Sequence, residues 1–281
     1  MQIIKQKTKT LITKDNGRSS DGVSPNFIYG CLGGCMSSYC YVGRYNHDKV
    51  YVNENTDQIL DSIDTWVKSK PWPKVPNQCD DKYYIIDIGC STDIPLMNKY
   101  YDWQKVFSYF NESDYAKSTF ATKYPTKFIP NNYNLHKDKH RIRVSLMPQI
   151  ISNIVEPKTD LISDRIESIH NLQKYMEVHI NFSPIIYWDN WEKHYEELFQ
   201  MLEGIEFKSE CIFLTYNDIQ YQRNSELVND LCWKPELQEH KNSQYAPDNI
   251  RYKSDFKHGL IEKFKYLYSK YFDLETIRYI F

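Results

Sequence analysis

The sequence predicts an α/β protein whose main domain is a partial (β/α)6 TIM-like barrel, followed by a small C-terminal extension or hairpin. Two observations predict it. Runs rich in apolar, β-branched and aromatic residues recur along the chain, and helical patterns separate them. This alternation favours a parallel sheet covered by helices, and with about six such units a partial barrel is the natural closure. The length of 281 residues and the hydrophobic content of 41% suit one large domain of this kind.

The strands are predicted where apolar and β-branched residues run together, and the helices where apolar residues recur every three or four positions. The clearest helical pattern places Ile166, Ile169 and Leu172 on one face. The proline-rich stretch 70–76 predicts a loop, and the ending TIRYIF predicts a final strand over Thr276–Phe281. In chain order, the other predicted strands are Tyr83–Cys90, Ser118–Lys123, Arg141–Met147, Val178–Ile186 and Cys211–Tyr216, and the predicted helices are Thr56–Lys68, Trp103–Phe110, Ser163–Tyr175 and Trp191–Leu202.

These elements divide the chain into an N-terminal segment (1–24), the partial barrel (25–217) and a C-terminal extension (218–281) that could contact nucleic acid. In barrels of this kind the chemistry takes place at the carboxyl ends of the strands. Residues with reactive or polar side chains near those predicted ends are Cys90, Lys123, Ser145 and Ser183.

The most informative motif is CLGGCMSSYC, which places Cys31, Cys35 and Cys40 within ten residues. Three thiolates can hold three irons of a [4Fe–4S] cluster and leave the fourth iron open, and the glycines around Cys31 let the backbone wrap tightly. The alternatives are a zinc site or unrelated buried thiols. A structural zinc site usually takes four ligands in two separated pairs, and the sequence offers no second pair of Cys or His at that spacing. The pattern therefore favours an iron–sulfur cluster.

Composition limits the remaining classes. The net charge of −2 gives no general support for nucleic-acid binding, and no apolar run approaches the length of a membrane span. The first fifteen residues lack the apolar core of a signal peptide. Seven cysteines without an export signal indicate a reducing, cytoplasmic location.

Two stretches, Lys123–Arg143 and Arg251–Lys270, each carry six Lys or Arg residues interleaved with aromatic residues. Such mixtures suit a phosphate backbone with exposed bases. The alternative, which the sequence slightly favours, is that both are solvated faces whose aromatic side chains belong to the core.

Further segments, in their order and spacing, resemble the spore photoproduct lyase family of the radical S-adenosylmethionine (SAM) superfamily over roughly residues 25 to 217. The segments are Tyr84–Pro95 (YIIDIGCSTDIP), Phe120–Tyr124 (FATKY), Arg141–Ser145 (RIRVS), Asn153–Thr159 (NIVEPKT) with Arg165, and Phe182–Trp191 (FSPIIYWDNW). The second gap between the cluster cysteines holds four residues, where the superfamily usually has two.

The resemblance implies a barrel of the radical SAM type and a role for each matching residue. Cys31, Cys35 and Cys40 would bind the cluster, and SAM would chelate the open iron. Cys90 would return a hydrogen atom to the product radical, and Tyr39 and Tyr41, which flank Cys40, would relay the radical back to SAM. The positions that match SAM contacts are Thr92, Lys123, Ser145 and Ser183.

The function that the resemblance implies is repair of the methylene-bridged thymine dimer of spore DNA to two thymines. Its implied partners are DNA with a thymine lesion and an electron donor such as flavodoxin or ferredoxin, with no membrane and a monomeric state. Two alternatives stay open: a radical SAM enzyme that modifies a different DNA or RNA base, and a non-catalytic iron–sulfur protein that binds nucleic acid.

Overall fold

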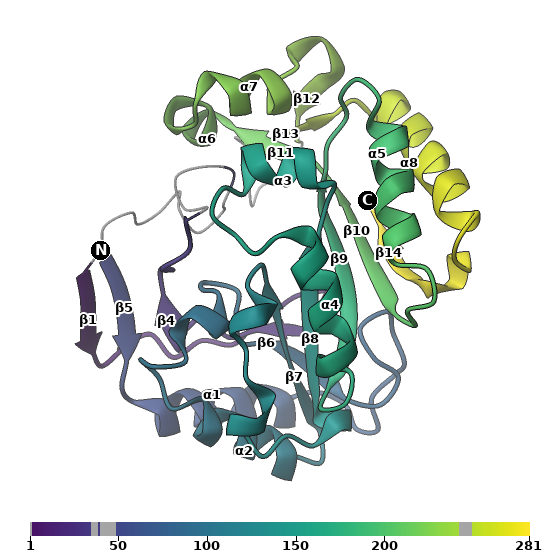
Figure 1. The fold of residues 1–281 in the computed structure, drawn as a ribbon. Coiled ribbons are helices and arrows are strands. Elements are labelled where there is room, and N and C mark those ends of the chain that lie inside the picture. The colour runs from purple at the N-terminus through teal and green to yellow at the C-terminus, as the bar shows by residue number, and fades with distance from the viewer. Residues whose placement is uncertain (1, 35–38, 40–48, 242–248) are drawn as a thin grey trace.

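The fold is taken from a computed structural model that describes residues 2–34, 39, 49–241 and 249–281. Its main sheet has eight strands in the order β14-β10-β9-β8-β7-β6-β3-β2. Every neighbouring pair from β3 to β14 is parallel, and only β2 runs antiparallel to its neighbour. The sheet curls into a half-barrel (Figure 1), so the predicted fold class is confirmed. The strand bounds are β2 Lys14–Asp15, β3 Gly22–Val23, β6 Tyr84–Asp87, β7 Ala116–Thr122, β8 His140–Leu146, β9 Glu177–Ile185, β10 Lys208–Phe213 and β14 Ile277–Ile280.

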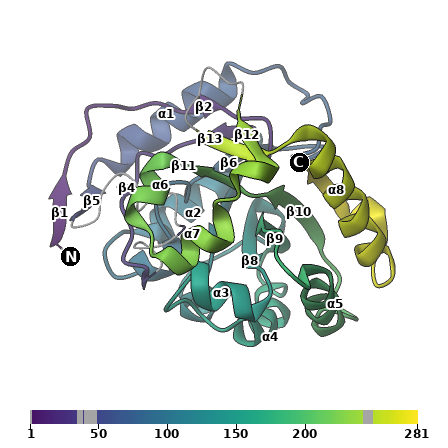
Figure 2. The same cartoon turned by 90° about the horizontal axis from the view of Figure 1, so that it is seen from above.

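Helices cover the convex side of the sheet, as Figure 2 shows from above. The four predicted helices are confirmed as α1 (Thr56–Lys68), α2 (Trp103–Glu112), α4 (Ile162–Leu172) and α5 (Trp191–Met201). A further long helix, α8 (Ser254–Ser269), was not predicted; it packs beside α5 and leads into the predicted final strand, β14. In the part of the chain that the structure describes, none of the helices combines the length and apolarity that a membrane crossing requires.

Two smaller sheets flank the barrel. The first orders β1 (Gln2–Gln6), β5 (Lys49–Asn53) and β4 (Ile28–Tyr29) side by side, and the second orders β11 (Thr215–Asn217), β13 (Asn249–Tyr252) and β12 (Gln238–His240). The second sheet and the short helices α3 (Gln149–Val155), α6 (Asp218–Arg223) and α7 (Glu226–Cys232) gather above the barrel in Figure 1.

Two predicted strands differ from the observed ones. The run Cys211–Tyr216 is not one strand, because the chain leaves the main sheet after Phe213 and β11 pairs with β13 instead. The run Tyr83–Cys90 ends as a strand at Asp87, because the Asp87 carboxylate accepts a hydrogen bond from the backbone N–H of Gly89 at 2.9 Å and turns the chain. The predictions were wrong there because apolar runs do not mark where a strand changes sheet or bends.

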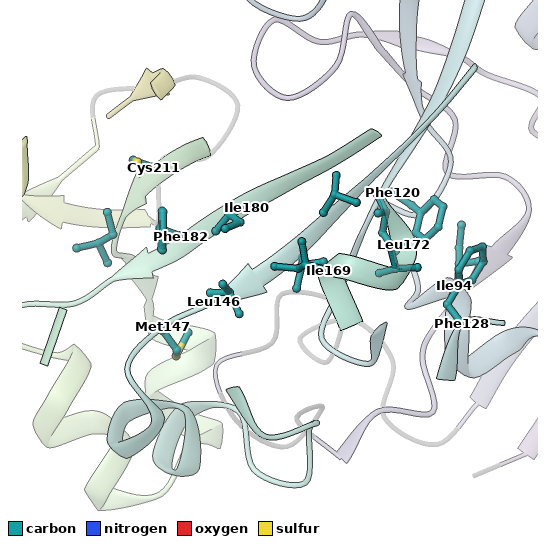
Figure 3. Packing of buried hydrophobic residues seen from close by; sticks show 14 of the residues in the cluster. Ile94, Phe120, Phe128, Leu146, Met147, Ile169, Leu172, Ile180, Phe182 and Cys211 are labelled. Atoms are coloured by element: carbon teal, nitrogen blue, oxygen red, sulfur yellow. The ribbon is translucent and has the colours of Figure 1, made fainter. Parts of the chain in front are cut away.

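The core lies between the sheet and the outer helices. Phe120, Ile180 and Phe182 project from the strands, and Ile169 and Leu172 from α4 pack toward them (Figure 3). The helical spacing of Ile166, Ile169 and Leu172 therefore marks the face of α4 that is buried, as predicted. This packing fixes the relative positions of the strand ends, where the predicted site residues lie.

Candidate active site

The loop that carries Cys31 crosses the carboxyl ends of β6 and β7. The backbone N–H of Gly30 donates to the carbonyl of Ser91 at 3.1 Å, and that of Gly34 donates to the hydroxyl of Tyr124 at 2.9 Å. Gly30 has φ of +101°, a conformation that favours glycine. The Cys31 side chain is buried. Cys35, Cys40 and Tyr41 lie outside the residues that the structure describes.

Cys90 sits on the turn that follows β6, beside the Cys31 loop. A Cβ on Gly89 would lie 2.7 Å from the Cβ of Phe120, so only glycine fits before this cysteine. Burial of the thiol and the nearby Asp87 carboxylate raise the pKa of Cys90 to about 12. The sulfur therefore keeps its hydrogen at neutral pH.

Tyr39 is placed by contacts to the second small sheet and to α6. Its hydroxyl donates to the carbonyl of Thr215 at 3.2 Å, and its own carbonyl accepts from the side-chain amide of Gln220 at 3.0 Å. Its ring stacks on that of Tyr216 with centroids 6.3 Å apart. Burial raises the pKa of Tyr39 far above the usual range, so the phenol stays protonated.

Small polar side chains face the barrel interior at the ends of β8 and β9. The parallel register pairs Ser145 with Asn181, and Ser183 lies two residues further along the same face. The side-chain oxygen of Asn181 and the hydroxyl of Thr92 are buried and have no hydrogen-bond partner among the residues that the structure describes. A buried polar atom normally has such a partner, so these two atoms mark a place where a polar ligand fits. Sequence reasoning missed Asn181, which is one of the polar residues that alternate with apolar ones along β9.

Lys123 belongs to a buried charged cluster behind this face. Its ammonium lies 2.8 Å from a carboxylate oxygen of Glu156, whose other oxygen lies 3.0 Å from the guanidinium of Arg165. Burial opposes ionisation, but the two cations lower the pKa of Glu156 below its usual value. Arg165 also donates to the carbonyl of Ser145 at 2.8 Å, so the cluster ties α4 to the end of β8.

The family of the chain follows from its sequence over nearly its whole length. The family model for spore photoproduct lyase matches residues 5–280. The chain belongs to the spore photoproduct lyase family. It is 27% identical to the spore photoproduct lyase of Clostridium acetobutylicum over 276 residues, covering 92% of this chain and 77% of that one. To the spore photoproduct lyase of Bacillus subtilis it is 24% identical over 288 residues, covering 94% of this chain and 78% of that one.

Solved structures of spore photoproduct lyase share the fold. A mutant with dinucleoside spore photoproduct matches with a TM-score of 0.82 and 19% identity, covering 99% of this chain and 82% of that one. A second mutant, with bound AdoMet and dinucleoside spore photoproduct, matches with a TM-score of 0.81 and the same identity and coverage. The half-barrel seen in this chain is therefore the spore photoproduct lyase fold.

In this member of the spore photoproduct lyase family, a layer of paired charges crosses the barrel interior below the small polar residues. Arg143 on β8 contacts the carboxylates of Asp87 and Glu210, and Arg278 on β14 lies 2.7 Å from Glu210. The interpretation of Lys123–Arg143 as a nucleic-acid surface or a solvated face is wrong for Arg141 and Arg143, which are only 2% and 5% exposed. Sequence alone could not separate these interior arginines from surface ones.

Proposed function

We propose that this protein is a radical SAM lyase that reverses the spore photoproduct, 5-thyminyl-5,6-dihydrothymine, to two thymines. Membership of the spore photoproduct lyase family supports the reaction class. The observation that carries the proposal is the place of Cys90, a thiol on the turn after β6 that is hydrogen-bonded to the Cys31 loop through the Ser91 carbonyl at 3.1 Å. A thiol that keeps its hydrogen is the form required of a hydrogen-atom donor.

We propose that Cys31, Cys35 and Cys40 hold a [4Fe–4S] cluster, and that Thr92, Lys123, Ser145 and Ser183 hold SAM. The buried oxygens of Thr92 and Asn181, which lack a partner among the described residues, support a polar ligand at the ends of β6 and β9. When bound, the reduced cluster and SAM supply a 5′-deoxyadenosyl radical that takes one hydrogen atom from the lesion.

The residues of the chain then complete the repair. Once the bridge between the thymines has broken, the S–H bond of Cys90 gives its hydrogen atom to the carbon-centred radical, which leaves a thiyl radical on the sulfur. A phenol of the tyrosine pair Tyr39 and Tyr41 would return a hydrogen atom to that sulfur, and the phenoxyl radical so formed would take a hydrogen atom from 5′-deoxyadenosine, which passes the radical back toward SAM. Burial of the Tyr39 hydroxyl favours this role, because the neutral phenol carries the hydrogen to be transferred.

The partners follow from this chemistry. DNA with a thymine lesion is the substrate, and a flavodoxin or ferredoxin would supply the electron that reduces the cluster. We further propose that the protein acts as a monomer and that it works in the cytoplasm. The free thiols of Cys79, Cys211 and Cys232 support the second part, because cysteines stay reduced there.

The test is an anaerobic assay of the reconstituted protein with SAM, dithionite and the dinucleotide form of spore photoproduct. Mass spectrometry measures thymidylyl-thymidine and 5′-deoxyadenosine together. Cys90→Ala should still form 5′-deoxyadenosine but fail to give clean thymidylyl-thymidine, whereas Cys79→Ala, at the amino end of β6, should repair like the wild type. Normal product from Cys90→Ala contradicts the donor role. If the wild type forms 5′-deoxyadenosine without repair, the substrate is a different base. If it forms neither 5′-deoxyadenosine nor thymidylyl-thymidine, the protein is non-catalytic.

A further inference from the structure

A cationic cavity of about 410 Å³ lies at the open side of the half-barrel. The two edges of the main sheet are β2 and β14. The cavity is lined by Arg18, which follows β2, and by Phe281, which follows β14. Lys241, Arg251 and Lys257 complete its charged lining, from the second small sheet and α8. Figure 2 shows the C-terminus beside the start of α8.

The four cations of this cavity lie close to one another. The guanidinium of Arg18 lies 4.0 Å from the ring centre of Phe281, and the ammonium of Lys257 lies 5.7 Å from the same ring. Burial, together with the neighbouring Arg18 and Arg251, lowers the pKa of both Lys241 and Lys257. Like charges held together in a half-buried place repel one another, and a bound anion removes that cost.

Within the described part of the chain, one carboxylate pairs with a cation of this cluster. Arg251 pairs with Glu239 at 3.2 Å. Among the residues that the structure describes, no carboxylate lies within 4.0 Å of the charged groups of Arg18, Lys241 or Lys257. The cavity therefore presents three uncompensated positive charges within the described part of the chain, which suits a phosphate group.

The cavity adjoins the candidate active site. Thr215 lines it, and the carbonyl of Thr215 accepts the hydrogen bond from the Tyr39 hydroxyl. A nucleotide that is turned into the barrel leaves the flanking strand outside, at the rim formed by the strand ends. The backbone of that strand has to be held there by phosphate contacts, which position DNA without reading its sequence.

We propose that the cavity lined by Arg18, Lys241, Arg251 and Lys257 binds a backbone phosphate of the DNA strand next to the lesion. This inference rests on the proposed repair function, because it assigns the part of the substrate that lies outside the lesion dinucleotide. It also gives the C-terminal extension and the second basic stretch a specific role.

The test compares a DNA oligonucleotide that carries one spore photoproduct with the dinucleotide form. The double variant Arg18→Gln/Lys257→Gln removes two cations from the cavity, and Lys263→Gln removes an exposed cation from the same helix as a matched control. Binding weakens as salt rises, and each lost phosphate contact should make the negative slope of log K against log salt shallower by about 0.7–0.9. We expect the slope of the double variant to be shallower than that of the wild type by about 1.4–1.8, and its affinity for the oligonucleotide to be on the order of tenfold weaker. Its repair of the dinucleotide should stay within about twofold of the wild type.

Lys257→Arg in the Arg18→Gln background should restore about half of the slope, which separates lost charge from misfolding. An unchanged slope and affinity in the double variant, or an equal loss of dinucleotide repair, would overturn the inference. Loss of inorganic phosphate binding with unchanged oligonucleotide binding would also overturn it, since the anion would then be free phosphate. If the wild type repairs no dinucleotide, the repair function fails, but the salt slope still tests the cavity.

Discussion

Replacing Glu156 by Gln removes the carboxylate that lies between Lys123 and Arg165. The side chains of Glu156 and Arg165 are fully buried, and that of Lys123 is 18% exposed. The amide can still accept one hydrogen bond but leaves the Arg165 guanidinium buried without its counter-charge. Because removing one partner of a buried pair costs about 3–5 kcal/mol, and Lys123 keeps some contact with water, we expect a loss near 3 kcal/mol at pH 7.

Urea denaturation of the anaerobically purified protein measures this loss, with Glu192→Gln as the matched control. Glu192 pairs with Lys263 at 2.8 Å, but both side chains are about half exposed, so its replacement should cost less than about 1 kcal/mol. Equal effects of the two variants would refute the reasoning, because burial would then not set the strength of the pair.

The pH dependence gives a second check on Glu156. Its pKa is lowered in the folded protein, so the stabilisation is fully present above the unfolded value, about 4.3, and is lost as the pH falls through the folded value. The difference in stability between wild type and Glu156→Gln should be constant from pH 7 to about 5 and narrow below about 4. A difference that grows with acid would contradict the assignment.

Three further outcomes are expected. Gly34→Ala should lower the iron bound after reconstitution, because the added Cβ would lie 2.5 Å from the Cβ of Lys158, whereas Gly17→Ala, with open space around it, should bind iron normally. Alkylation of Cys90, followed by peptide mass spectrometry, should keep rising with pH beyond 9 toward its pKa of about 12; a plateau near pH 9 would contradict that value. Burial raises the pKa of Asp93 from 3.8 to about 6, so ionising it takes stability away; relative to Asp93→Asn, the wild type should lose up to about 3 kcal/mol between pH 4 and 6 in urea denaturation.

The fold could be predicted because its signals are local. The helix Thr56–Lys68 has the predicted bounds, and α4 buries the predicted face. In an amphipathic helix the spacing of the apolar residues indicates which face is buried. Helix α8 was missed because its apolar residues are spread among basic and aromatic ones, and its buried Phe264 and Tyr268 were interpreted as part of a basic stretch. Tertiary packing, rather than a clear helical period, determines which of its faces is inside.

The candidate site was predicted in part, through motifs. The sequence indicated Cys31, Cys90 and Tyr39, and the structure brings their segments to the same end of the barrel. The motif NIVEPKT was noticed without a role for Glu156, because its partners Lys123 and Arg165 come from other elements. Which buried charges pair depends on the register of distant strands and helices, and no local pattern contains that information.

The barrel interior changes character within two residues along β8, and this change bears on where a ligand fits. At Arg143 the interior is filled by a guanidinium whose charge is met by Asp87 and Glu210. Buried charges are tolerated when they are paired, so this layer needs no bound ligand to neutralise it. Two residues further along β8, at Ser145 and its register partner Asn181, the side chains are short, and the buried side-chain oxygen of Asn181 has no hydrogen-bond partner in the described part of the chain. The layer formed by Arg143, Asp87 and Glu210 therefore bounds the site on one side. A polar ligand fits next to it, at the carboxyl end of the strands, where Cys90 also lies.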